Sequence, residues 1–244
     1  ENFKQDVADT SVYVSVGKSD AWSNSTSDVT DGTITDFPPN DTLDDIGEAR
    51  QNMIGLKKIA SADIAHVVPR HTWTTGTQYV PWDSEDSGIF DKKFYAVTSE
   101  FKVYLCINNG SDPENPKGKT SKFEPTHTST TVPAADNTAT GDGYQWKYLY
   151  TIAPADIVKF VTTSYIPLPE KWGDVSTKTI KDAAVDGKLE TIVINRRGTA
   201  TVDGVDGDIS GIPIIGDGTG GTATATVTNG VVSEIKLSNT NSSG

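Results

Sequence analysis

Oxygen-bearing side chains near the end of the chain have the spacing of a partial calcium-binding loop. Asp206, Asp208 and Ser210 occupy every second position, Gly211 the sixth and Asp217 the twelfth. Loops that hold Ca²⁺ between two helices place oxygen ligands at these positions and glycine at the sixth. Here the last ligand is shorter than the usual Glu, a proline interrupts the loop, and neither flank has a helical pattern. We therefore expect Asp-Gly turns between strands and no metal site.

Two tryptophans stand next to carboxylates. Trp82 precedes Asp83, and Trp172 lies two residues before Asp174. Sugar-cleaving sites use a pair of carboxylates, and sugar-binding sites add aromatic platforms. Asp and Glu number 33 in this chain, so the pairing does not single out a site. We expect no catalytic residue, and non-catalytic glycan binding stays open as the alternative.

The few histidines and the single cysteine do not suggest a metal centre. His66, His71, His127 and Cys106 are the only residues of their kinds. Structural zinc sites are built mainly from several cysteines with histidines, so we expect neither a metal nor a cofactor. We place His71 and His127 at the surface and His66 half-buried. Cys106 lies in a strand-like apolar run, which indicates a buried structural thiol.

The overall charge excludes some partners. Lys and Arg total 21 against 33 acids, which gives a formal charge of −12. Binding of nucleic acid needs a concentrated basic surface, and no run of this chain provides one. No segment approaches the ~20 apolar residues that a helix needs to cross a bilayer. We expect no nucleic-acid or membrane partner.

The elements that position these side chains are arranged around residues 144–152. Gly141-Asp142-Gly143 form a turn, and the residues after it alternate with the period of a strand. One face carries Tyr144, Trp146, Tyr148, Tyr150 and Ile152. Aromatic side chains of this size need a second layer to pack against. The pattern predicts a core strand in an antiparallel sheet that is covered mainly on one side.

The rest of the first 187 residues is interpreted in the same way. Alternation predicts strands at residues 11–17 and 94–107, and a short strand that ends at Pro69. A helix is expected from a cap at Asp41 or Thr42 to Lys57-Lys58 in its last turn. Residues 154–160 predict one or two helical turns, and residues 164–169 an extended edge segment. Residues 108–141 contain few apolar side chains and form a long excursion, a kind of segment that often carries function.

The composition changes near residue 187. From Leu189 onward the chain contains no aromatic residue and is rich in Gly, Thr, Val, Ile and Asp. TIVI at residues 191–194 and EIKL at 234–237 are similar, which hints at a repeat that continues beyond Gly244. The TATATV run from Thr222 predicts a strand with a dry face of small residues. We therefore expect one domain at residues 1–187 and a β-rich, truncated appendage at 188–244.

Four sequence blocks carry a resemblance to a known family. They are VSVGKSDAWS at residues 14–23, VVPRHTW at 67–73, GDGYQWKYL at 141–149, and YI with PE and WG between residues 165 and 173. In this order they resemble the wedge subunit encoded by gene eight in the baseplates of T-even-type contractile-tailed phages. The Gly- and Thr-rich end is similar to the β repeats of large phage tail proteins.

The resemblance implies a fold and a role. It implies a layered antiparallel β-sandwich with helix-bearing loops, in the mainly β class, and a homodimer. It also implies a structural, non-enzymatic protein of the virion tail baseplate, assembled in the host cytoplasm with other wedge proteins as partners. The alternative is a tail-fibre or adhesin module that binds glycan on the host surface.

Four side chains are candidate anchors for partner proteins, namely Trp22, Arg70, Trp73 and Trp82. All four lie in predicted loops, and Trp and Arg are enriched among the residues that dominate binding energy at interfaces. The competing interpretation is that these side chains only close the edges of the core.

Overall fold

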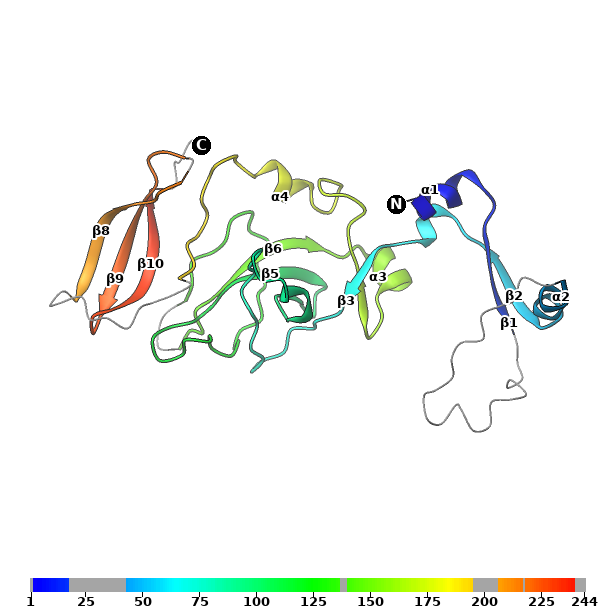
Figure 1. Ribbon diagram of the computed structural model, residues 1–244, viewed down its shortest axis with the longest axis horizontal. Coiled ribbons are helices and arrows are strands. Elements are labelled where there is room, and N and C mark those ends of the chain that lie inside the picture. The colour runs from blue at the N-terminus through cyan, green and yellow to red at the C-terminus, as the bar shows by residue number, and fades with distance from the viewer. Residues whose placement is uncertain (1, 18–42, 137–139, 195–205, 217, 240–244) are drawn as a thin grey trace. The chain divides into compact units, whose positions relative to one another are not determined.

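The structure is a computed structural model that describes residues 2–17, 43–136, 140–194, 206–216 and 218–239 (Figure 1). The chain divides into two compact units, Glu1–Ala65 and His66–Gly244. Strands dominate the described ranges, whose four sheets are built from antiparallel pairs. The predicted mainly β class is confirmed. The predicted domain boundary at residues 187 and 188 stays a prediction. Within the described ranges, no helix is long and apolar enough to cross a membrane.

The first unit is a two-stranded ribbon with short helices. β1 (Tyr13–Gly17) pairs with β2 (Met53–Lys58), accompanied by α1 (Asn2–Asp9), α2 (Leu43–Gln51) and the 3-10 turn η1 (Ser61–Asp63). The predicted strand at residues 11–17 is confirmed. The helix predicted to reach Lys58 is wrong, because α2 ends at Gln51 and the next residues pair with β1. Gly55 is a poor helix former, and cross-strand pairing overrides the weak helical pattern around it.

The second unit is built around a three-stranded sheet in the order β4-β5-β6. β4 (Tyr95–Val97) and β5 (Lys102–Asn109) are joined by a tight turn, whereas β5 and β6 (Tyr144–Thr151) are joined by residues 110–143. Both strand predictions are confirmed, as is the long excursion between them. In Figure 1, β5 and β6 run side by side in the middle of this unit. The excursion therefore connects two strands that are neighbours in the sheet.

A bulge divides the row of aromatic side chains on β6. Tyr104 pairs with Tyr148 and Val103 with Tyr150, so Leu149 is the extra residue. Tyr144 and Trp146 then belong to one buried cluster, and Tyr150 and Ile152 to another. The two clusters lie on opposite faces, because neighbours in one strand, such as Val103 and Tyr104, belong to different clusters. The prediction of one shared face, with the other partly wet, is therefore wrong.

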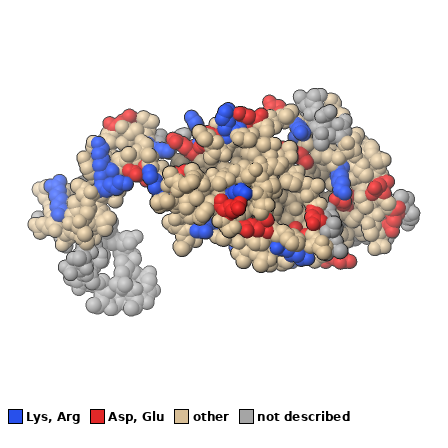
Figure 2. Space-filling model, turned by 180° about the vertical axis from the view of Figure 1, so that it is seen from behind, with Lys and Arg blue, Asp and Glu red and all other residues tan. Residues whose placement is uncertain are grey.

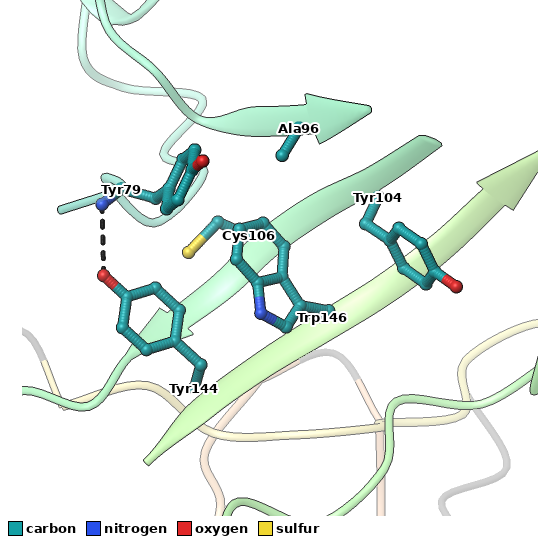
Figure 3. Close-up of a cluster of buried hydrophobic side chains, with 6 residues drawn as sticks. All are labelled: Tyr79, Ala96, Tyr104, Cys106, Tyr144 and Trp146. Carbon is teal, nitrogen blue, oxygen red and sulfur yellow. Dashed lines mark hydrogen bonds between the residues drawn. The ribbon is translucent and has the colours of Figure 1, made fainter. Parts of the chain in front are cut away.

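The first cluster consists of Tyr79, Ala96, Tyr104, Cys106, Tyr144 and Trp146 (Figure 3). Cys106 is fully buried, as predicted, and burial raises the pKa of its thiol, with a smaller contribution from Asp142. The thiolate needed for reactivity is therefore disfavoured. The indole Nε1 of Trp146 is buried and has no hydrogen-bond partner among the described residues. This side chain is therefore held in place by packing of the aromatic rings and not by a hydrogen bond of its indole N–H.

The second cluster is covered by small elements from before and after the central sheet in the chain. β3 (Val67–Pro69) pairs with β7 (Tyr165–Pro167), and α3 (Pro154–Phe160) precedes β7. Ile166 is fully buried in the cluster, and Val68, Ile157 and Val161 pack against it. These elements confirm the predictions of a short strand ending at Pro69, a short helix and an extended segment at residues 164–169. A further helix, α4 (Lys178–Asp182), lies outside the sheets.

A separate sheet with the order β10-β9-β8 ends the second unit, formed by β8 (Gly207–Pro213), β9 (Thr222–Thr228) and β10 (Val231–Asn239). Ala223, Ala225 and Val227 are buried and alternate with more exposed threonines, which confirms the dry face predicted for this strand. Residues 191–194 belong to no strand, whereas residues 234–237 lie in β10. The two segments that suggested a repeat thus differ in conformation, and the repeat stays a prediction.

Candidate protein-protein interface

The acidic spacing near the end of the chain belongs to a sheet. Asp208 lies in β8, where its Oδ1 accepts a hydrogen bond from Thr226 Oγ1 at 2.7 Å. Asp206 Oδ1 accepts one from the backbone N–H of Gly230 at 3.1 Å. The calcium interpretation is not supported, because both carboxylates accept hydrogen bonds from neighbouring parts of this sheet. Asp217 lies outside the described residues. Across the part of the chain that is described, no group of three His, Cys, Asp or Glu side chains is placed to hold a metal ion.

The histidines are placed differently from the prediction. His66 is exposed, whereas His71 and His127 are half-buried. Burial, with smaller effects of nearby Lys93 and Lys102, holds the pKa values of His71 and His127 below the ordinary value. The reason is tertiary: the His71 ring lies 4.8 Å from that of Tyr95, and the His127 ring 5.3 Å from that of Tyr104. Both histidines pack against aromatic side chains of the central sheet, which the local sequence does not reveal.

The carboxylate after Trp172 is also used by the local turn. Asp174 Oδ1 accepts hydrogen bonds from Ser176 Oγ at 2.7 Å and from the backbone N–H of Ser176 at 3.0 Å. Partial burial alone would raise the pKa of Asp174, but these hydrogen bonds outweigh it and lower the pKa. Trp172 is exposed beside this turn. Its neighbouring acid therefore has a structural task that accounts for its position.

Two of the four predicted anchors are tied into the fold. Arg70 donates from Nε to Thr72 Oγ1 and from Nη1 to the carbonyl of Thr162, each at 3.0 Å, so it joins the end of β3 to the chain before β7. Trp73 is half-buried against the first cluster and donates from Nε1 to Ser121 Oγ at 3.1 Å. Both side chains are thus hydrogen-bonded to other segments of the second unit. Trp22 lies outside the described residues.

Trp82 is the anchor with the clearest surface position. It is 38% exposed and lies in a cluster with Phe90, which is 75% exposed, and the half-buried Phe94. The ring centroids are 6.2 Å apart for Trp82 and Phe90, 5.0 Å for Trp82 and Phe94, and 6.0 Å for Phe90 and Phe94. We call these three side chains the aromatic knob. Exposed apolar side chains that lie together, and not singly, are candidates for a binding site.

Sequence reasoning missed Phe90 and Phe94 as members of this surface. The signal was the high aromatic content of residues 70–91, which includes both the exposed Phe90 and the fully buried Tyr79. Local sequence does not separate these two environments. The exposure of Phe90 follows from its neighbour in η2 (Ile89–Asp91). Ile89 is buried, so the side chain of the next residue, Phe90, points outward.

The loop that carries the aromatic knob is fixed at its base. The backbone N–H of Val80 donates to the carbonyl of Lys93 at 3.0 Å, which closes residues 80–93 into a compact loop. The backbone of Cys106 in β5 holds both ends of this loop. Its carbonyl accepts a hydrogen bond from the N–H of Trp82, and its N–H donates one to the carbonyl of Phe94, each at 2.8 Å. The knob is therefore mounted on the central sheet.

The tip of the loop is held by Asp86. Its Oδ1 accepts from the backbone N–H of Gly88 at 2.9 Å, and its Oδ2 pairs with Lys92 Nζ at 2.5 Å. Hydrogen bonds from Lys92 and Gly88 lower the pKa of the Asp86 carboxyl. Asp86 is thus charged at neutral pH, and the turn that presents Phe90 stays formed.

Comparison with known proteins gives two findings. Residues 96–206 match the model of the family described as Bacteriophage T4, Gp8. The chain is also 24% identical over 178 residues to the baseplate wedge protein gp8 of Enterobacteria phage T4. The resemblance to the Gp8 family is confirmed. The similarity covers 65% of this chain and 52% of the T4 protein, so the chain spans about half the length of this curated relative.

The Gp8-like segment corresponds to a definite part of the fold. It begins in β4 and includes β5, β6, α3, β7 and α4. Both buried clusters draw most of their side chains from this segment. The aromatic knob lies just before it, on a loop bonded to β5. The Gp8 match therefore accounts for the scaffold, while the role of the knob depends on its own geometry.

Proposed function

We propose that this chain is a structural subunit of a phage tail baseplate wedge and acts through protein-protein contacts without catalysis. The observation that carries the proposal is the Gp8 match over the residues that build the central sheet. The rigid sheet, the fixed loops and the exposed aromatic side chains suit a part that joins other subunits. Its place would be the tail baseplate of the virion, after assembly in the host cytoplasm.

The partners belong to the same proposal. We infer contacts with other wedge proteins of the phage that encodes this chain, and a homodimer as the state in which the subunit joins the wedge. Trp82 is the strongest of the three predicted anchors that the structure describes, because its ring is at the surface and its backbone is bonded to β5. Arg70 and Trp73 would act mainly by holding the loops that present the contact surface.

Co-purification tests the proposal. The full chain is co-expressed with each other baseplate protein of the same phage, and the products are analysed by size-exclusion chromatography with light scattering. We expect a stable complex with at least one wedge protein and a dimer mass for the chain alone. Immunogold microscopy of particles should label the baseplate rim. Label confined to the tail fibres, with binding to host cells by the isolated chain, would contradict the proposal and favour the adhesin alternative.

A further inference from the structure

The aromatic knob has the properties of a preformed binding element. Phe90 is the most exposed of its three rings, with three quarters of its surface exposed, whereas Phe94 is half-buried and packs against the second cluster. Exposed apolar area of this kind is unfavourable in water and is recovered on burial, at roughly 25 cal/mol per Å². The loop beneath is already fixed by the bonds of Cys106 and Asp86. Little conformational entropy is lost when such a surface binds, because its bound shape exists beforehand.

The rim of the aromatic knob is acidic. Asp83, Glu85 and Asp91 are exposed on the same loop, and none of them forms an ion pair with the other described residues. Of the two lysines on the loop, Lys92 is paired with Asp86. Elsewhere, on the face that Figure 2 shows, basic and acidic side chains are interspersed. The loop thus presents three carboxylates that form no ion pair, against one exposed lysine, Lys93, that also forms none among the described residues.

The three rings of the aromatic knob do not lie in one plane, so they do not suit a flat ligand. Phe90 makes interplanar angles of 68° with Trp82 and 81° with Phe94, and Trp82 and Phe94 make 48°. Rings tilted in this way do not form the flat platform on which a sugar ring stacks. A second copy docked face to face would set acids against acids. A partner with an opposite charge avoids both problems.

We propose that the aromatic knob inserts into an apolar pocket, rimmed by Lys or Arg side chains, on another protein of the baseplate wedge. Phe90 fills the pocket, and Glu85 and Asp91 pair with the basic rim. An arginine of the rim can also lie over an exposed ring while it bonds to a carboxylate. The inference rests on the proposed function, and it names the chemistry of the partner surface.

Affinity measurements on the full chain test this docking. The probe is the purified wedge protein that forms a complex with the wild-type chain. Phe90→Ala should weaken binding by about tenfold or more, as expected for a central apolar anchor. Phe123→Ala is the matched control, because Phe123 is 57% exposed on another loop, and its affinity should equal wild type.

A charge reversal gives an independent measurement. Glu85→Lys should slow association with the same wedge protein and reduce the dependence of affinity on salt, since one attractive charge becomes repulsive. Glu114→Lys makes the same change at another exposed glutamate and should leave both quantities unchanged. Circular dichroism melts verify that the four variants fold, which the exposure of these side chains leads us to expect.

The outcomes separate this inference from the proposed function. If the wild-type chain binds no wedge protein, both fail. If the wild-type chain binds a wedge protein, and the Phe90→Ala and Glu85→Lys variants bind it as tightly as wild type does, the proposed function stands. The docking inference is then overturned. Binding of the wild-type chain to a neutral glycan on an array, lost in Phe90→Ala, would also overturn the inference and assign the knob to sugar recognition.

Discussion

The hydroxyl of Tyr144 joins three segments that are distant in sequence. It donates to the carbonyl of Lys119 at 2.7 Å. It also accepts from the backbone N–H of Tyr79 at 3.1 Å, the bond drawn in Figure 3. Tyr79 is fully buried, so water cannot replace this acceptor. One side chain at the start of β6 thereby fixes both the loop before β4 and the excursion after β5.

Tyr144→Phe is expected to lower the free energy of unfolding by about 1–3 kcal/mol, because it leaves a buried N–H without a partner. Thermal and urea unfolding measure the effect. Tyr104→Phe is the control, since the Tyr104 hydroxyl only donates, to the carbonyl of His127 at 2.6 Å. An equal loss in both variants would show that the N–H of Tyr79 finds another acceptor.

Substitutions of Trp73 test whether this side chain is a binding anchor or part of the core. Because its ring packs on the first cluster and its Nε1 bonds to the fully buried Ser121, we expect Trp73→Ala to lower the free energy of unfolding by about 2–3 kcal/mol. Trp73→Phe should retain most of the packing and lose the hydrogen bond. Melting curves check both variants. An unchanged melting temperature combined with lost wedge binding would restore the anchor interpretation.

At the residue scale, sequence was most reliable where local alternation fixes the environment. Cys106 was correctly placed in the core on the face of Tyr104. The histidines were not, because their burial depends on loops that arrive from elsewhere in the chain. For the same reason, the sequence identified Trp82 as a candidate but gave no indication that Phe90 and Phe94 complete its cluster.

At the scale of elements, the excursion between β5 and β6 is anchored at both ends. Gly110 has φ +67°, and a Cβ at this position would lie 2.0 Å from the carbonyl oxygen of Asp142. The Asp142 carboxylate, in turn, accepts from the N–H groups of Lys122 and Tyr144 at 2.8 and 3.1 Å. The first and last residues of the excursion are therefore in contact, and only glycine fits at its start.

Gly110→Ala is expected to destabilise the protein strongly, by about 3 kcal/mol or more, from backbone strain and a clash together. Gly76→Ala isolates the strain, since Gly76 has φ +81° and no atom would lie within 4 Å of the new Cβ. That control should cost about 1–2 kcal/mol. Denaturant unfolding of both variants gives the difference, and equal losses would disprove the close approach of Gly110 and Asp142.

Most elements of the second unit could be predicted, and the errors have physical causes. The turn before Tyr144 and the period of two identify β6, but a bulge depends on the partner strand and has no clear local signal. In the first unit, the sequence prediction merged α2 and β2 into one helix, because a few apolar residues fit a helical face by chance. The pairing of β2 with β1, across more than thirty residues, decides its conformation.

For the whole molecule, the buried tyrosines predict sensitivity to alkali. Burial raises the pKa of Tyr95 to about 12, and burial, with smaller effects of neighbouring groups, raises those of Tyr104, Tyr144 and Tyr150 further above the ordinary value of 10.0. A raised folded-state pKa means that the stabilisation is complete below the unfolded-state value and is lost as pH rises through the folded-state value.

We therefore expect unfolding to begin above about pH 10, with the buried tyrosines ionising as the protein unfolds. Tyrosinate absorbance and far-ultraviolet circular dichroism, followed together against pH, check this. The later part of the absorbance change should coincide with the loss of circular dichroism. Full ionisation of all tyrosines while the circular dichroism is still native would contradict the burial of these hydroxyls.

The long excursion also has a consequence for folding on the ribosome. β5 is complete at Asn109, but its neighbour begins only at Tyr144. Closing a loop of this length costs on the order of 3 kcal/mol of chain entropy, whereas the turn between β4 and β5 is short. The β4-β5 hairpin is expected to form first and to wait with one open strand edge until β6 is synthesised. Unpaired edges of this kind template wrong associations. The interval between residues 109 and 151 is therefore a stage of synthesis that is exposed to aggregation.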